Sequence, residues 1–205
     1  PLDLNLVFSG HGKHLDCPTL QLANHHGLMI AGEAALSNWD AGMDMYIYGK
    51  LGNLIMTKEG INVLMTNLTG KVPPILQRLD YIRFNGEAAG YLHDLTLTGL
   101  FYTGAGMVKT DVMMSIDEQS MSRTYSGSVA SADLDLGKLL NQEKKFGKVD
   151  FNVELKGFNY KNRYPESYIK GIISSFEYSQ YQYENIMLDG VYKDGGFNGR
   201  LSMDD

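Results

Sequence analysis

The chain has 205 residues with 24 acidic and 18 basic side chains, which gives a formal charge of −6. The negative charge and the scattered Lys and Arg residues argue against binding to a phosphate backbone, so we expect no nucleic-acid partner. The single cysteine, Cys17, excludes an internal disulfide. No stretch approaches the roughly 20 apolar residues of a membrane-spanning helix. We expect both ends, at Pro1 and Asp205, to be cut from a longer polypeptide.

Apolar residues occupy every second position in several segments, which is the period of a strand with one buried face. The alternation opens with Leu2, Leu4, Leu6 and Phe8. It returns at 43–47, 108–116 and 149–155, where Val, Ile, Phe and other strand-favouring residues are common. The sequence therefore predicts an all-β protein.

A finer pattern, apolar-any-apolar-any-Gly, is an internal repeat of irregular spacing. Its seven copies are Leu6, Phe8, Gly10; Leu28, Ile30, Gly32; Met45, Ile47, Gly49; Ile82, Phe84, Gly86; Leu95, Leu97, Gly99; Val153, Leu155, Gly157; and Ile186, Leu188, Gly190. Each Gly lies on the face of its apolar pair and permits a bend or bulge. We predict a long curved antiparallel sheet folded over an apolar interior, as a trough or an open half-barrel-like sandwich.

Helical signals are few and short. Pro74 to Leu79 predicts one or two helical turns, and Leu134 to Leu140 predicts another. Asp194, Gly195 and Gly196 predict a hairpin turn. The polar run 141–145 is the expected boundary between a glycine-punctuated β module, 1–140, and a second β module, 141–205, continuous with the first.

His11, His14 and Cys17, followed by His25 and His26, form the one metal-like cluster of the sequence. The spacing of the first three suits zinc, but an adjacent partner pair does not, so we assign them to a polar loop and expect no metal.

No stretch of the sequence carries a catalytic motif. The segment 9–13 lacks the glycine spacing of a phosphate loop, and pairs such as Asp133 with Asp135 have no His that would assign an acid/base role. We expect no enzyme activity and no cofactor. Tyr178, Tyr181 and Tyr183 either stack on a sugar or cover the sheet, and strand spacing favours the second reading.

Four stretches in the last third of the chain resemble the Bacteroidetes branch of the AsmA-like/TamB translocation and assembly proteins. They are DLDLGKLL at 133–140 with GKVDFNVELKG at 147–157, IKGIISSFEY at 169–178, and YENIMLDGVYKDGGFNGRLSMDD at 183–205. The first 132 residues share only the glycine rhythm.

The resemblance implies an internal fragment of a long periplasmic protein, anchored to the inner membrane through a segment absent here. It implies a folded-over sheet whose trough carries phospholipid between the inner and outer membranes and which serves outer-membrane protein assembly. The expected partners are phospholipid acyl chains and outer-membrane assembly proteins. No catalytic residue is implied.

The residues expected to face lipid are apolar members of the alternating segments. They are Leu28, Ile30, Met45, Ile47, Ile82, Phe84, Leu95, Leu97, Val153, Leu155, Ile186, Leu188, Phe197 and Leu201. Eleven Met residues fit a lining that adapts to variable apolar partners. The alternation alone favours an ordinary sandwich core, whereas the resemblance favours a trough. The alternatives are a scaffold that pairs an edge strand with a client during outer-membrane protein assembly, and a sugar-binding β-sandwich.

Overall fold

The computed structural model describes residues 2–120, 122–159 and 166–203. Strands make up 70% of the structure and helices 11%. Neighbouring strands pair antiparallel throughout the described ladders. The prediction of an open, antiparallel all-β structure with few short helices is therefore confirmed. The chain forms two compact units, Pro1–Leu92 with Thr98–Ala105 and His93–Leu97 with Gly106–Asp205.

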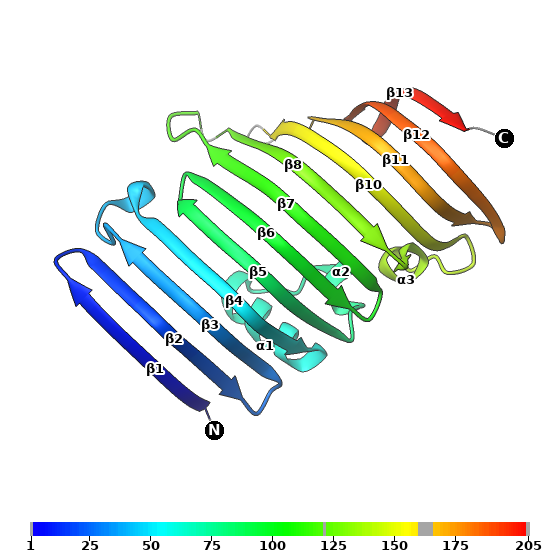
Figure 1. The fold of residues 1–205 in the computed structure, drawn as a ribbon. Helices are drawn as coiled ribbons and strands as arrows, with labels where there is room; N and C mark the ends of the chain where they lie inside the picture. Colours follow the sequence, from blue (N-terminus) through cyan, green and yellow to red (C-terminus); the bar gives the residue numbers. More distant parts are fainter. Residues whose placement is uncertain (1, 121, 160–165, 204–205) are drawn as a thin grey trace. The chain divides into compact units, whose positions relative to one another are not determined.

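In the first unit, consecutive strands of the chain are neighbours in the sheet (Figure 1). The strands are β1 (Leu2–His11), β2 (His14–Asn24), β3 (Leu28–Ser37), β4 (Tyr46–Thr57) and β5 (Tyr81–Tyr91). β6 (Asp94–Thr103) follows, and its residues 98–103 belong to this unit. Tight turns join β1 to β2 and β2 to β3. Within each strand, the side chains alternate between the two faces of the sheet.

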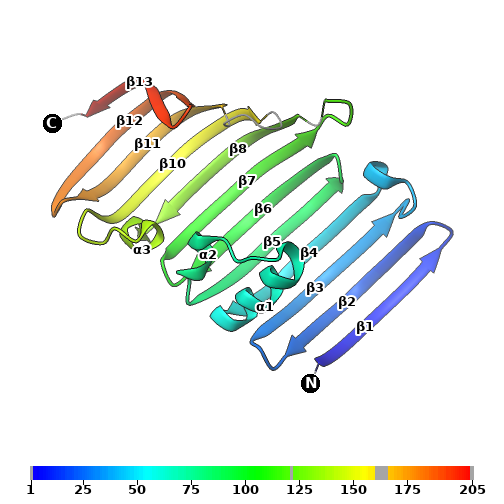
Figure 2. The same ribbon diagram turned by 180° about the vertical axis from the view of Figure 1, so that it is seen from behind.

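Helices cover part of one face of the first unit. α1 (Lys58–Thr69) contacts β4, β5 and the short α2 (Pro74–Gln77), and Figure 2 shows both helices in front of these strands. Ile61 of α1 is 1% exposed, and Ile82 and Phe84 of β5 are 8% and 6% exposed. The Phe84 ring lies 4.5 Å from the Phe101 ring, centroid to centroid. This cluster is the core of the unit.

The helix α1 was missed by the sequence analysis, which expected helix only near 74–79 and 134–140. Its signals are present: the Thr57 Oγ1 atom accepts a hydrogen bond from Gly60 N at 3.3 Å, which is an N-cap. Gly70 ends the helix in the left-handed conformation, with φ of 73°. Ile61, with Leu64 and Met65, gives the i, i+3, i+4 spacing of an apolar helix face. A helix layer thus does cover part of this sheet.

The second unit repeats the consecutive strand order. Its elements are β7 (Gly106–Ile116), β8 (Arg123–Ala132), β9 (Leu134–Asp135), α3 (Leu136–Leu140), β10 (Phe146–Asn159), β11 (Glu166–Tyr178), β12 (Tyr181–Lys193) and β13 (Gly196–Met203). β9 pairs with β10 beside α3, and among the described strands β13 pairs with β12 alone.

The predicted short elements are confirmed. Pro74 begins α2, α3 ends at Leu140, and Asp194 and Gly195 have positive φ in the two-residue turn between β12 and β13. The alternation at 43–47 predicted a strand there, and this prediction is wrong for its first half. Gly42–Asp44 forms a single 3-10 turn, η1, and β4 begins at Tyr46. The predicted module boundary after Leu140 lies between α3 and β10, within the second unit, and stays a prediction.

The glycines of the repeat leave space for aromatic rings more often than they bend the sheet. A bulge occurs at Gly32, but the strand register is unbroken through Gly157 and Gly190. A methyl group at Gly190 would lie 2.6 Å from the Phe197 ring, and one at Gly157 would lie 2.5 Å from the Tyr125 hydroxyl. Each ring therefore lies over a glycine of the neighbouring strand. The ring fills the space that a side chain at the glycine would occupy.

Candidate functional site

The six predicted lipid-facing residues on β10, β12 and β13 of the second unit lie on one face of its sheet. Strand pairing aligns one row across this face: Val129, Val153, Gly171, Leu188 and Leu201. The neighbouring rows are also formed by cross-strand partners. One row joins Leu155, Ile169 and Gly190, and another joins Ile173, Ile186 and Met203. A third pairs Tyr192 with Phe197. We call this side the apolar face, and the side that carries Lys156, Lys170, Asp189 and Arg200 the polar face.

Exposure on the apolar face rises toward β13. Val153 of β10 is buried at 9% exposure, Leu188 of β12 is half-buried, and Leu201 of β13 is 60% exposed. Leu155 and Ile186 are half-buried, and Phe197 is 38% exposed. Val153 is a core residue, paired with Val129 and Gly171. The other five remain accessible to an apolar ligand.

The predicted lipid-facing residues of the first unit divide into core and surface. Leu28, Ile30 and Ile47 are half-buried and pair across β3 and β4 with Met56, Leu54 and Leu36. Ile82 and Phe84 are buried among the residues that α1 and α2 help to cover, so we assign them to the core. Met45 precedes β4.

Leu95 and Leu97 lie at the start of β6, in the part of that strand that belongs to the second unit. Both are half-buried and alternate with the exposed Thr96. Leu95 and Leu97 therefore follow the period-two alternation from which they were predicted to face lipid.

A pocket of about 340 Å³ opens on the apolar face of the second unit, and apolar and aromatic side chains line it. They are Phe146, Phe176, Tyr178, Tyr183, Ile186, Leu201 and Met203. The rings form a continuous group, with centroids 5.5 Å apart for Phe146 and Tyr178 and 6.5 Å apart for Phe176 and Tyr183. The volume lies at the lower end of the range for small-ligand sites. We call it the aromatic pocket.

Three backbone irregularities lie among these rings, and the first is a shift of the β10–β11 register between Phe146 and Val149. The register between β10 and β11 shifts between Asp150 and Phe151, so Ser174 of β11 has no direct partner in β10. In β12, Asn185 has φ of 53°, a left-handed conformation. A bulge changes which face the following residues occupy. Phe176 and Tyr183 therefore line the same pocket as Ile186, although a regular alternation would place them on the other face.

The tyrosine cluster of the sequence belongs to this apolar site. Tyr178 and Tyr183 line the pocket, and Tyr181 is 69% exposed with its ring 5.6 Å from that of Tyr183. Their companions in the lining are Ile186, Leu201 and Met203, whereas sugar recognition uses polar groups beside an aromatic platform. The lining therefore favours an apolar ligand.

The polar face carries paired charges. Lys170 Nζ lies 3.9 Å from the Asp189 carboxylate, and the Tyr168 hydroxyl donates a hydrogen bond to Asp189 at 2.7 Å. That hydrogen bond raises the pKa of Tyr168 above its ordinary value of 10.0. Cross-strand pairs of this kind suit a solvated sheet surface. The charged pairs of this sheet therefore lie on the polar face, although exposed Ile172 and Met187 lie there too.

The structure does not bring His11, His14 and Cys17 together. His11 and His14 are cross-strand partners at the β1–β2 turn, whereas Cys17 lies three residues on, on the opposite face of β2, where its thiol donates to Thr19 O at 3.2 Å. His25 and His26 lie in the turn at the other end of β2.

His14 instead contacts Asp16 at 2.9 Å through Nε2 and Ser37 at 2.6 Å through Nδ1. These are the residue types of a nucleophilic triad, which the sequence analysis did not connect. The His14 and Asp16 side chains are 49% and 53% exposed, so solvent surrounds them. A nucleophilic site needs preorganised oxyanion donors in a water-excluded setting. We therefore describe the three as a polar contact across β2 and β3.

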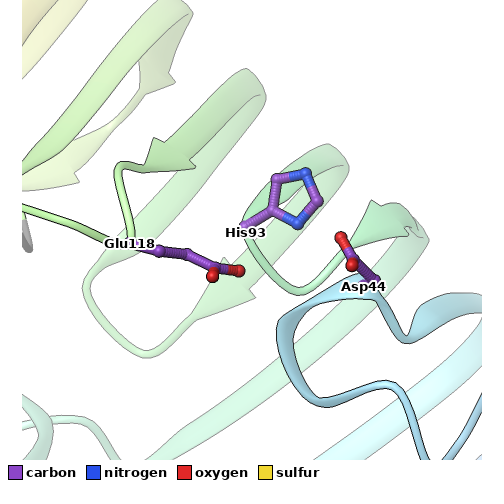
Figure 3. A group of neighbouring side chains, drawn as sticks. All are labelled: Asp44, His93 and Glu118. Atoms are coloured by element: carbon purple, nitrogen blue, oxygen red, sulfur yellow. The ribbon is translucent and has the colours of Figure 1, made fainter.

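Figure 3 shows three titratable side chains that lie in turns. His93 lies between β5 and β6 and Glu118 lies after β7, both in the second unit, and their ligand atoms lie within 4.8 Å of each other. Asp44 lies in η1 of the first unit. The second unit thus offers two ligand groups here, fewer than the three protein ligands of even a catalytic zinc site.

Comparison of the chain with protein-family models, curated proteins and solved structures gives no significant match. The likeness to the AsmA-like/TamB family therefore rests on the sequence stretches given above. Among the described residues, no helix is long and apolar enough to cross a membrane.

The sequence analysis missed Phe146, Phe176 and Met203 as members of the site. The signal was partial: Tyr178, Tyr181 and Tyr183 stood out as a cluster around a Ser-Gln turn, but the bulge that joins them to Ile186 leaves no mark in the alternation.

Proposed function

We propose that this chain is a non-enzymatic segment of a periplasmic envelope-biogenesis protein and that its apolar face carries phospholipid acyl chains between the inner and outer membranes. The whole protein would be anchored to the inner membrane through a segment outside these residues. The observation that supports the proposal most is the accessible apolar face of β10–β13, which ends in the aromatic pocket.

The physical argument is one of transfer from water. Each methylene of an acyl chain that leaves water contributes about 0.8 kcal/mol. Leu188, Leu201 and Met203 offer aliphatic and thioether surfaces that accommodate chains of variable position. A face of this kind is otherwise a liability for a single sheet layer in water. Transient occupation by acyl chains would cover it.

One observation favours a second candidate function. Among the described strands β1 pairs only with β2 and β13 only with β12, so each has one edge without a partner strand among these residues. Such an edge can add a strand from a client, which is the mechanism expected of a scaffold in outer-membrane protein assembly. Arg200 is the one charged side chain of β13. We rank the scaffold function second because strand pairing at an edge assigns no role to the aromatic pocket.

The test compares aspartate substitutions at an accessible and a buried site of the same row. Leu188→Asp should keep the fold, because a hydrated carboxylate is tolerated on an open face, and should reduce the lipid that co-purifies. Ile30→Asp tests the first unit in the same way. Val153→Asp, at 9% exposure, should destabilise the chain by several kcal/mol.

Thermal melting and mass spectrometry of bound lipid provide the two measurements. A lipid-free wild-type protein, together with unfolding of Leu188→Asp to the extent seen for Val153→Asp, would contradict the proposal and assign the face to an ordinary core.

A further inference from the structure

The Lys145 side chain carries a cation over two rings of the aromatic pocket. The Lys145 ammonium is 5.7 Å from the Phe146 ring centroid and 6.0 Å from that of Tyr178. Both distances fall within the range of cation–π attraction. The backbone of Lys145 is fixed on both sides, because its N–H donates to Gln142 O at 2.9 Å and its carbonyl accepts from Ser179 N at 2.7 Å. These bonds fix the Cα of Lys145 at the edge of the pocket, and the side chain carries the ammonium over the two rings.

The acidic side chains of the adjoining strands face away from the pocket. Glu177 lies between Phe176 and Tyr178 in β11 and therefore points to the opposite face, where its side chain lies over Gly147. Glu184 is hydrogen-bonded to Gln182, the cross-strand partner of Glu177. Glu143 lies in the same turn as Lys145 and is exposed. The Lys145 ammonium lies 5.7 Å from the centroid of the Phe146 ring, whereas Glu177 points to the opposite face.

Two tyrosines of the pocket lining carry hydroxyl groups that can act as polar donors. Tyr178 and Tyr183 contribute to the pocket, and within the described part of the chain neither hydroxyl makes a hydrogen bond. A phenol can donate to a phosphate oxygen, and an ammonium adds a charge-assisted hydrogen bond. An apolar pocket with a cation and two donors matches a molecule with an acyl chain and an anionic head.

We propose that the aromatic pocket is a specific site for an anionic phospholipid, with one acyl chain in the pocket and the phosphate at Lys145. This inference rests on the proposed function and adds a headgroup preference to it. A zwitterionic phosphocholine head brings a second cation toward Lys145, and the repulsion between the two cations offsets part of the attraction between Lys145 and the phosphate. A phosphatidylglycerol head brings only the negative charge.

The test uses short-chain lipids as monomers in solution with the 205-residue chain. Calorimetric titration with dioctanoyl phosphatidylglycerol and dioctanoyl phosphatidylcholine compares the two heads on the same acyl chains. The anionic lipid should bind more tightly, and its advantage should shrink at high salt. Lys145→Gln should weaken phosphatidylglycerol binding about threefold, in keeping with an exposed charge pair, and should leave phosphatidylcholine binding unchanged.

Lys144→Gln is the matched control, because it removes the same charge one residue away and should leave both affinities as they are. Equal binding of the two lipids by the wild type, or equal effects of the two Lys variants, would overturn the headgroup preference and leave the proposed function standing. Tighter binding of dodecanoate than of phosphatidylglycerol would overturn the phospholipid assignment. Failure of both lipids to bind wild type would instead count against the proposed function.

Discussion

Replacing Gly190 with alanine tests whether the glycines of the repeat serve close packing across strands. In the structure Gly190 of β12 faces Gly199 of β13 in register. A methyl group on Gly190 would lie 2.6 Å from Cζ of Phe197, 2.7 Å from the carbonyl oxygen of Asn198 and 2.7 Å from Cα of Gly199. Two of these three atoms are backbone, so rotation of the Phe197 ring relieves only part of the clash.

The expected loss of stability is about 1–3 kcal/mol, the usual range for overpacking a tight contact. For a chain of this size that corresponds to a fall in melting temperature of roughly 2–4 °C per kcal/mol. Urea unfolding followed by circular dichroism measures the free energy. Phe197→Leu in the Gly190→Ala background should recover part of the loss, and a double-mutant cycle isolates the ring contribution.

Gly49 provides a control from the same repeat, because no atom lies within 4 Å of a methyl group placed there and its φ is not positive. Gly49→Ala should be neutral or stabilising by up to about 1 kcal/mol, since alanine reduces the freedom of the unfolded chain. Equal effects of the Gly190 and Gly49 substitutions would refute the packing explanation.

Two further predictions concern the first unit. Thr57→Ala removes the acceptor for Gly60 N and should destabilise α1 by about 1 kcal/mol in urea unfolding, whereas Thr57→Ser should retain most of the cap. Asp40 lies 2.7 Å from Lys13, and this hydrogen bond lowers the pKa of Asp40 below 3.8. The contact should therefore stabilise the fold above that pH and lose its effect as the pH falls through the lowered pKa. Asp40→Asn should be less stable than wild type at pH 6, and the difference should shrink as the pH falls through the lowered pKa of Asp40; a pH-independent difference would contradict this origin.

The strands and tight turns could be predicted because period two and turn chemistry are local properties. The segment 149–155 alternates without interruption and lies within β10. The register between β10 and β11 nevertheless shifts inside this segment. Asp194-Gly195 supplies the two positive φ values of a hairpin turn. α1 was predictable from Thr57 and Gly70, but its short apolar stripe was overlooked among the strand signals.

The aromatic pocket could not be predicted from alternation. Phe176 and Ile173 are three residues apart, which in a regular strand means opposite faces. The shift at Ser174 and the left-handed Asn185 bring Phe176, Tyr183 and Ile186 to one side. Bulges of this kind depend on pairing with neighbouring strands, and a single sequence does not reveal where they occur.

The most direct test of the lipid-carrying face compares photocrosslinking from its two sides in living cells, using the whole protein. Leu201 on the apolar face is 60% exposed, and Ile172 on the polar face is 49% exposed, so a photoreactive residue is similarly accessible at either position. After irradiation, mass spectrometry should find phospholipid adducts at position 201 and few at position 172. Equal adducts at both positions, or none at 201 in a folded protein, would contradict the assignment of the apolar face to acyl chains.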